Sequence, residues 1–292
     1  MIDKINNFLG LARVQQYIKN LFIFVPIFFA GQITDLELLL NVLIAFIAFS
    51  ISASSIYILN DSLDIEEDRQ HPQKKFRPLA SGDISKKTAL VLMFIFFIIG
   101  ISMMGALSFQ AFVILGAYIT LNIVYSYYLK HIAIIDVTII AIGFVLRLFV
   151  GSVVAEIQLS SWIILMTFLL SLFIALAKRR SDILIFLNTG NKMRNVIDGY
   201  NLEFTNAAMV IMASVIIVTY TLYATSIEVV QRAQSEYLYL TTLFVILGIM
   251  RYLQIVFVEN EGSSPTKIVF KDKFMQITIL AWTLSFSWIL YL

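Results

Sequence analysis

Long apolar segments separated by short polar ones dominate the pattern of this chain. Nine of them approach the roughly 20 residues that a helix needs to cross the hydrocarbon core of a bilayer. They cover residues 18–34, 38–59, 87–107, 109–128, 133–154, 161–177, 205–226, 237–257 and 274–291. The pattern therefore predicts an all-α, polytopic bundle of nine transmembrane helices, of which Pro26 interrupts the first.

The polar stretches indicate how the bundle is organised. The two longest follow the second and sixth spans, which suggests two related halves, although no clear internal repeat is present. We expect one transmembrane domain over residues 1–292, capped by loops 60–86, 129–132, 178–204 and 258–273. Residues 1–16 mix polar and apolar positions, as an amphipathic helix on the membrane surface does.

Composition agrees with a membrane protein and excludes other classes. The chain is 60% hydrophobic and 14% charged, with a mean hydropathy of +0.87. A surface that apolar is stable only in a bilayer. A net charge of +2 without a basic stripe excludes a nucleic-acid partner. Because the chain has no cysteine, disulfides and thiolate metal sites are excluded as well.

The basic residues predict an orientation. Most of the 21 Lys and Arg residues precede the first span or follow even-numbered spans. Only Arg232 falls on the opposite side, while Arg147 and Arg251 lie within spans. Since cytoplasmic loops carry the excess of Lys and Arg, we expect the N-terminus inside and the C-terminus outside the cytoplasmic (inner) cell membrane.

Acidic side chains end the second span. Tyr57, Asp61, Asp64 and Asp68 are spaced by four, three and four residues, so they share one face of a helix. On that helix Asp61 and Asp68 would lie about 10 Å apart along the axis. Solvated acids at a helix end are the alternative, but Asn60 and Asp61 interrupt an apolar helix, where polar groups are costly. Because Mg²⁺ prefers such hard oxygen ligands and substrate phosphate, we predict a cytoplasmic Mg²⁺ site at Asn60, Asp61, Asp64 and Asp68, in which the three carboxylates are catalytic.

A basic segment follows the acidic one directly. It contains Arg69, Lys74, Lys75 and Arg77. Positive-inside topology or a patch for anionic lipid headgroups would explain it too. Beside a metal site, we favour contacts to the oxygens of a phosphorylated substrate, through the planar fork of Arg77 in particular. For Lys74 and Lys75 topology explains the sequence equally well, and His71 receives no catalytic role.

Charged residues of the later spans form a second group. Asp136 and Arg147 share a face of the fifth span, three turns apart. An Arg at that depth needs a paired partner or a water-filled cavity, so a structural ion pair and a phosphate ligand both remain open. After the sixth span, Lys178 and Asp182 are four residues apart and have the spacing of a helical pair. Arg194 follows in the same loop.

Together these residues resemble the UbiA-type intramembrane prenyltransferases, which are bundles of nine spans with acidic motifs after spans two and six. The motif at 60–68 is shared by that whole superfamily. Further matches lie at 19–21, 71–78, 125–130 with Asp136, 144–147 with Gly151, 178–179, 200–204, 251–252 and 261–266. These matches are similar to a branch of the superfamily whose donor is phosphoribosyl diphosphate.

The resemblance implies a Mg²⁺-dependent enzyme that transfers 5-phosphoribosyl from phosphoribosyl diphosphate to a polyprenyl phosphate of the decaprenyl type. Implied substrate contacts are Lys19, Tyr57, Arg69, Lys75, Arg77, Tyr125, Lys130, Asp136, Arg147, Lys178, Arg179 and Arg194. Users of prenyl diphosphates carry a second Asp pair after span six, where this chain has three basic residues and a lone Asp182. That departure favours a substrate with more phosphate to neutralise.

Two alternatives remain. Within the same fold, the protein would be an isoprenyl transferase acting on an aromatic quinone or haem precursor. Within a different class, it would be a transporter whose intramembrane charges line a pathway, although an acidic cluster at one membrane face rather than at the midplane argues against this. The pattern is compatible with an oligomer and does not set its size.

Overall fold

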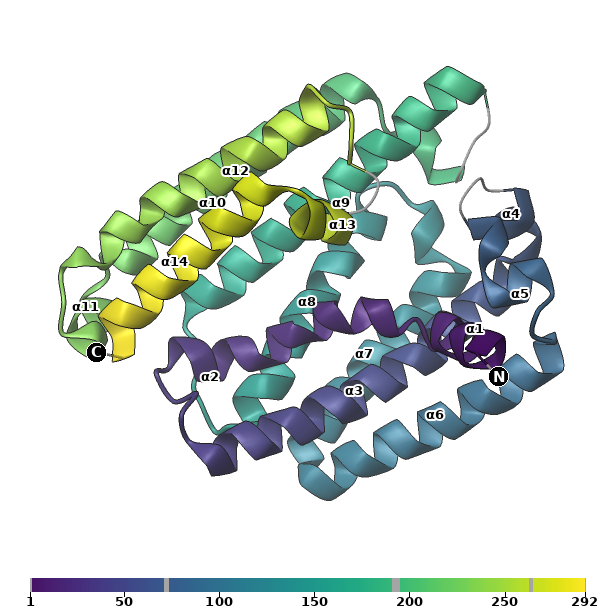
Figure 1. The fold of residues 1–292 in the computed structure, drawn as a ribbon, viewed down its shortest axis with the longest axis horizontal. Coiled ribbons are helices and arrows are strands. Elements are labelled where there is room, and N and C mark those ends of the chain that lie inside the picture. The colour runs from purple at the N-terminus through teal and green to yellow at the C-terminus, as the bar shows by residue number, and fades with distance from the viewer. Residues whose placement is uncertain (1, 71–73, 191–194, 263–264, 292) are drawn as a thin grey trace. The chain divides into compact units, whose positions relative to one another are not determined.

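The computed structural model describes residues 2–70, 74–190, 195–262 and 265–291, and every regular element among them is a helix (Figure 1). The chain forms two compact units. Unit 1 contains Met1–Lys130 and Ile142–Leu159, and unit 2 contains His131–Ala141 and Ser160–Leu292. Helix α8 belongs to both, because its first turns lie in unit 2 and the rest in unit 1.

Eight helical segments are long and apolar enough to cross a membrane. They are α3 (Leu36–Leu63), α6 (Lys86–Leu107), α7 (Phe109–Tyr127), α8 (Ile135–Val154), α9 (Ser161–Thr189), α10 (Leu202–Ala224), η5 (Tyr237–Thr241) continued by α12 (Thr242–Phe257), and α14 (Lys273–Tyr291). A shorter apolar segment precedes them, built from the 3₁₀ helix η1 (Val14–Phe24) and α2 (Val25–Phe29). The predicted all-α membrane bundle is confirmed for the described part of the chain.

The first predicted span differs most from its expected form. It begins at Val14 rather than residue 18 and ends at Phe29. Pro26 lies in the first turn of α2, where a missing backbone donor costs little. The chain turns after Phe29, and Gly31 adopts a φ of 74° that suits glycine.

Two helices run past their predicted ends into what the pattern assigned to loops. Helix α3 includes residues 60–63, and α9 continues to Thr189. Lys178, Arg179 and Arg180 therefore lie on a helix and not in a loop. Hydrophobicity ends near residue 177, but the helix ends only where Gly190 adopts the left-handed conformation that commonly stops one.

Short helices fill the connections. They are α1 (Ile2–Ala12), α4 (Ile65–Gln70), η2 (Lys74–Phe76), α5 (Pro78–Ser81), η3 (Leu129–His131), η4 (Asn195–Gly199), α11 (Ile227–Ala233) and α13 (Pro265–Lys271). Helix α1 confirms the helix expected near the N-terminus, although it ends at Ala12 rather than residue 16.

In unit 1, α3 and α6 lie side by side (Figure 1). Small residues permit this approach, since a Cβ added at Gly100 of α6 would lie 2.8 Å from the Ala48 carbonyl oxygen and would also collide with the Ser52 hydroxyl. Gly151 of α8 packs in the same way against the backbone carbonyl of Ile23. Close backbone contact through small residues is typical of helices within a bilayer.

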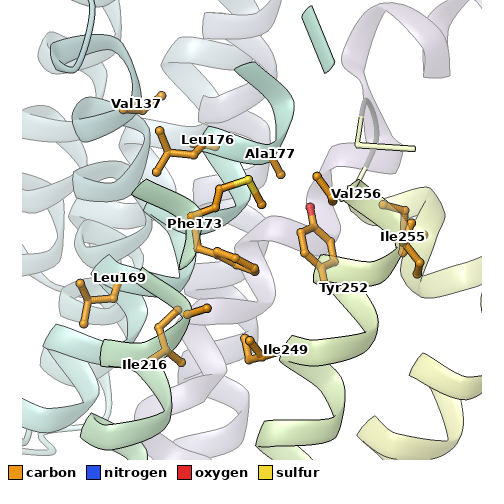
Figure 2. Close-up of a cluster of buried hydrophobic side chains, with 14 of the residues drawn as sticks. Val137, Leu169, Phe173, Leu176, Ala177, Ile216, Ile249, Tyr252, Ile255 and Val256 are labelled. Carbon is orange, nitrogen blue, oxygen red and sulfur yellow. The ribbon is translucent and has the colours of Figure 1, made fainter. Parts of the chain in front are cut away.

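In unit 2, α9, α10 and α12 surround an apolar core (Figure 2). The rings of Phe173 and Tyr252 meet there at 5.2 Å between centroids, and Ile216 contributes from α10. Helix α14 packs on α12 (Figure 1), and the Trp282 indole donates a 2.8 Å hydrogen bond to the Tyr220 hydroxyl. This core therefore packs against α9, the helix that carries Arg179 and Asp182.

Candidate functional site

The acidic cluster of unit 1 forms where the second predicted span ends. Helix α3 stops at Leu63, Asp64 leaves helical geometry with φ −99° and ψ 16°, and α4 begins at Ile65. The prediction of one continuous helical face is therefore wrong. The break brings Asp61 and Asp68 around a single nitrogen, Arg77 Nη1, which lies 3.0 Å from Asp61 Oδ1 and 2.5 Å from Asp68 Oδ2.

Arginines cover both oxygens of Asp61. Arg13 Nε donates to Oδ2 at 3.0 Å, and Arg13 Nη2 donates to Oδ1, the oxygen that Arg77 also contacts. The Arg13 guanidinium lies 5.2 Å from the centre of the Tyr57 ring. The Asp61 side chain is only 4% exposed, so these arginines supply the positive charge that a buried carboxylate needs.

Lysines and an amide hold the other two carboxylates. Lys130 Nζ donates to Asp64 Oδ1 at 2.6 Å, and Asn60 Nδ2 donates to Asp64 Oδ2 at 3.0 Å. Lys74 Nζ lies 3.5 Å from Asp68 Oδ1. Asn60 therefore orients a carboxylate through its amide nitrogen in this arrangement.

The carboxylates of the cluster can hold a hard divalent cation, but they do not converge as the predicted set of ligands. Among the described residues, no three acidic or histidine side chains converge as metal ligands. Asp68 Oδ1, however, is buried and accepts no hydrogen bond from the described residues, although Lys74 Nζ lies 3.5 Å away, and Asp61 lies beside Asp68 around one nitrogen. Because Mg²⁺ commonly takes one or two carboxylates and completes its shell with water and phosphate, these two residues suffice to hold one.

The basic segment contributes unequally to this cluster. Arg77 lies within it, and burial, followed by the neighbouring Arg13 charge, lowers the pKa of its guanidinium. Arg69 instead binds the Ala80 carbonyl at 3.1 Å and Glu66 at 2.8 Å. Lys75 is exposed and lies over the Phe76 ring. His71 and Pro72, which belong to the matching segment 71–78, lie outside the described residues.

A second group of cations in unit 1, Arg147 and Lys19, has no carboxylate partner among the described residues. Arg147 is 4% exposed and donates to Asn20 Oδ1 at 2.8 Å, to the Gly143 carbonyl at 2.6 Å and to the Tyr118 hydroxyl at 3.1 Å. All three partners are neutral. Lys19 lies within electrostatic reach of Arg147 and Arg13, and in the described part of the chain no hydrogen bond or ion pair holds its ammonium.

Unit 2 contains a buried ion network of its own. Arg179 Nε donates to Asp136 Oδ2 at 2.6 Å, and its Nη1 donates to Asp182 Oδ2 at 2.7 Å. The Tyr200 hydroxyl donates to Asp136 Oδ1 at 2.6 Å and accepts from the Ile134 amide at 2.7 Å. Burial, and then this bond to Asp136, raises the pKa of the Tyr200 hydroxyl, which keeps its proton. The ion pair considered between Asp136 and Arg147 is therefore wrong, because Asp136 pairs with Arg179 while Arg147 binds neutral partners.

Other predicted residues lie near these groups. Asp182, which the sequence spacing related to Lys178, pairs with Arg179 at i,i+3. Lys178 is half-buried on α9, and Tyr125 is half-buried near the end of α7. Arg194 lies outside the described residues.

Arg13 is the residue that the sequence did not bring to the site. In the sequence, Arg13 contributes only to the predicted orientation in the membrane. It lies 48 positions from Asp61, so the sequence does not link the two residues. Its left-handed backbone, with φ 50° and ψ 45°, directs the chain from α1 into η1. No pattern in the sequence around Arg13 indicates its contact with Asp61.

Fold and site together define an integral membrane protein of all-helical architecture, with a cation-covered carboxylate cluster at the end of one span. The chain belongs to the UbiA prenyltransferase family, whose model matches residues 21–288. The resemblance noted from the sequence is thereby confirmed.

Relatives and solved structures agree with this membership. The chain is 30% identical to a decaprenyl-phosphate phosphoribosyltransferase of Corynebacterium glutamicum, over 96% of this chain and 85% of the relative. It is 31% identical to the protein of the same name from Mycolicibacterium smegmatis, over 95% of this chain and 90% of the relative. The solved structure of a UbiA homolog from Archaeoglobus fulgidus bound to DMAPP and Mg²⁺ superposes with a TM-score of 0.70 at 20% identity, covering 96% of this chain and 98% of that one. That likeness concerns the fold.

Proposed function

We propose that this protein transfers the 5-phosphoribosyl group of phosphoribosyl diphosphate to a polyprenyl phosphate of the decaprenyl type and releases diphosphate. The observation that carries this choice of substrates is the similarity, over nearly the whole chain, to two phosphoribosyltransferases that act on decaprenyl phosphate by name. The acceptor lipid resides in the bilayer that the apolar helices span, with the site on its cytoplasmic side.

Charge at the unit 1 cluster supports a heavily phosphorylated donor. Among the described residues, four cations face three carboxylates; they are Arg13, Lys74, Arg77 and Lys130 against Asp61, Asp64 and Asp68. Positive charge is thus in excess before any metal ion binds. Since phosphate oxygens form charge-assisted bonds with Arg and Lys, this excess favours a diphosphate together with a further phosphate.

Asp61 and Asp68, with Asp64 held nearby by Asn60, would hold Mg²⁺. The bound ion would neutralise negative charge on the departing diphosphate. Arg77 and Lys130 already lie at the carboxylates and are positioned to bind diphosphate oxygens as that charge develops. Asp64 and Asp68 in turn keep these two cations in place.

The transfer itself requires no protein base. The bond between ribose C1 and the diphosphate oxygen breaks, and its electron pair leaves with diphosphate. An oxygen of the lipid phosphate forms the new bond to C1 from the opposite face. That oxygen is already anionic at neutral pH, so the enzyme has to position it and to exclude water rather than remove a proton.

The remaining basic residues differ in how deeply their side chains are buried. Lys19 and Lys178 are half-buried candidates for a substrate phosphate. Arg147 and Arg179 are almost fully buried among protein partners, so we propose that they supply fixed positive charge and rigidity. Direct phosphate contacts for these two, and for Arg194, stay predictions from the sequence.

Transfer of radiolabel tests this function. Purified protein in detergent with Mg²⁺, labelled phosphoribosyl diphosphate and decaprenyl phosphate should yield a labelled lipid and one diphosphate per lipid formed. Chelation of the metal with EDTA should stop the reaction, and added Mg²⁺ should restore it. The Asp61→Asn variant should lose at least about 100-fold in rate while it stays folded.

The same preparation separates the alternatives. An isoprenyl transferase would leave these substrates unchanged and would instead join a prenyl diphosphate to an aromatic acid. A transporter would release no diphosphate in detergent, where no gradient exists. Either result, with folded protein, would refute the proposed function.

A further inference from the structure

Arg13 occupies a strained joint next to the acidic cluster. Helix α1 ends at Ala12, and Arg13 then adopts φ 50° and ψ 45°, a left-handed conformation uncommon for a side chain without special constraints. Backbone hydrogen bonds hold it there, from its amide to the Gly10 carbonyl at 3.2 Å and from the Gln16 amide to its carbonyl at 2.8 Å. Strain of this kind persists where the surroundings impose it, often at functional sites.

The joint directs the Arg13 side chain onto a proposed metal ligand. Arg13 Nε donates to Asp61 Oδ2 and Arg13 Nη2 donates to Oδ1, so the guanidinium contacts both carboxylate oxygens. A metal ion and this guanidinium cannot use the same lone pairs of Asp61. Oδ1 already accepts from both Arg13 and Arg77, which leaves a metal ion the second lone pair of Oδ2, directly beside the Arg13 charge, so the ion and Arg13 compete for Asp61.

A phosphate group is the ligand that suits a displaced arginine fork. The guanidinium matches two phosphate oxygens as well as it matches a carboxylate. The Arg13 side chain is 18% exposed, in contrast to 4% for Asp61, so it is accessible to a ligand. A diphosphate carried by the metal would arrive beside it.

We infer that Arg13 is a substrate-binding residue that exchanges Asp61 for the donor's diphosphate when the metal and the donor bind. This inference rests on the proposed function, because it requires a metal–diphosphate complex at Asp61. It adds the joint between α1 and η1 to the binding machinery. In the free protein, Arg13 competes with the metal; in the loaded protein, it holds the substrate.

Such an exchange predicts opposite effects of one substitution on two ligands. In the Arg13→Gln variant, Mn²⁺ alone should bind roughly three- to tenfold more tightly, because a competing cation near Asp61 is gone. Inorganic diphosphate, titrated in the presence of saturating Mn²⁺, should bind at least about tenfold more weakly, because a charge-assisted contact is lost. Electron paramagnetic resonance of Mn²⁺ and calorimetry of diphosphate measure the two affinities.

Matched variants make the result decisive. Arg13→Lys keeps the charge without the fork, so its Mn²⁺ affinity should stay near that of the wild type and its diphosphate affinity should recover in part. Arg232→Gln removes an exposed arginine of α11 and should change neither affinity. Thermal unfolding verifies that each variant is folded.

Different results would refute the proposed metal site and the proposed exchange by Arg13. If Asp61→Asn leaves Mn²⁺ binding intact, the proposed metal site itself is wrong. If Asp61→Asn weakens Mn²⁺ binding but Arg13→Gln weakens both ligands, or leaves diphosphate unaffected, then Arg13 has only a structural role and the exchange is refuted.

Discussion

Single side chains at the acidic cluster show how a membrane protein accommodates buried carboxylates. Asp61 and Asp68 are nearly inaccessible, and an isolated charge there would cost several kcal/mol. Arg13 and Arg77 offset part of that cost in the free protein. The same cations then remain available when phosphate arrives, so neutralisation and substrate binding use one set of residues.

Lys19 is the clearest single-residue test of substrate binding. Its ammonium has no bonding partner among the described residues and is repelled by Arg147 and Arg13. An anionic substrate would relieve that repulsion. We expect Lys19→Gln to raise the KM of one substrate at least about tenfold, with little loss of thermal stability. Steady-state kinetics with each substrate varied in turn measures this.

The matched control for Lys19 is Lys86→Gln at the exposed start of α6. It removes the same charge from the unit without touching either group of cations. Unchanged KM values in Lys19→Gln, or equal changes in both variants, would contradict a direct role for Lys19.

At the level of elements, the ends of helices carry the chemistry. The break between α3 and α4 gathers Asp61 and Asp68, while the extension of α9 carries Arg179 into a buried network. In both places the helix continues beyond the end of its apolar stretch. Loop boundaries drawn where hydrophobicity falls therefore miss both.

The network around Asp136 should be essential for the stability of unit 2. Asp136→Ala would leave Arg179 buried without its closest anion, so we expect a loss of about 3–5 kcal/mol in the free energy of unfolding. Tyr200→Phe removes the hydrogen bond to Asp136 and the one from the Ile134 amide, and should cost about 1–3 kcal/mol. Glu236→Ala, at an exposed position, should stay within about 0.5 kcal/mol of wild type. Denaturant unfolding in mixed micelles gives these values, and similar stability of all three variants would contradict the structural role.

Close packing of α3 on α6 gives a second prediction with a natural control. Gly100→Ala places a methyl group against the Ala48 carbonyl, and such overpacking should cost about 1–3 kcal/mol. Gly116 of α7 has no atom within 4 Å of an added Cβ, so Gly116→Ala should be neutral or stabilising by up to about 1 kcal/mol. Thermal unfolding in detergent compares the two, and equal midpoints would mean that the contact at Gly100 is loose.

For the whole molecule, orientation in the membrane is the property that bears on function. The protein is an integral membrane protein, and we propose from the distribution of Lys and Arg that the acidic cluster faces the cytoplasm. A donor such as phosphoribosyl diphosphate is anionic and water-soluble, so it has to reach the site from an aqueous compartment. The proposed function therefore depends on which side the cluster faces.

Because the chain contains no cysteine, single-cysteine variants test the orientation directly. Glu67→Cys lies beside the acidic cluster and Glu236→Cys lies between the seventh and eighth predicted spans, and both positions are exposed. A membrane-impermeant maleimide added to intact cells should label Glu236→Cys alone. Glu67→Cys should react only after permeabilisation, and the reverse pattern would invert the proposed topology.

The class of the protein and most of its helices follow from the linear pattern. Transfer of each apolar residue into lipid contributes independently of distant residues, so a run of such residues locates a span without knowledge of its neighbours. Eight of the nine predicted spans correspond to long helices, and the acidic motif marks the candidate site.

Which charges meet at that site depends on the folded arrangement. Arg13 reaches Asp61 across 48 positions, and Lys130 reaches Asp64 across 66. Such contacts arise from helix packing, whose energy depends on pairs of surfaces and not on any single stretch of sequence. The pairing of Asp136 with Arg179 has the same origin, which is why spacing along one helix named the wrong partner.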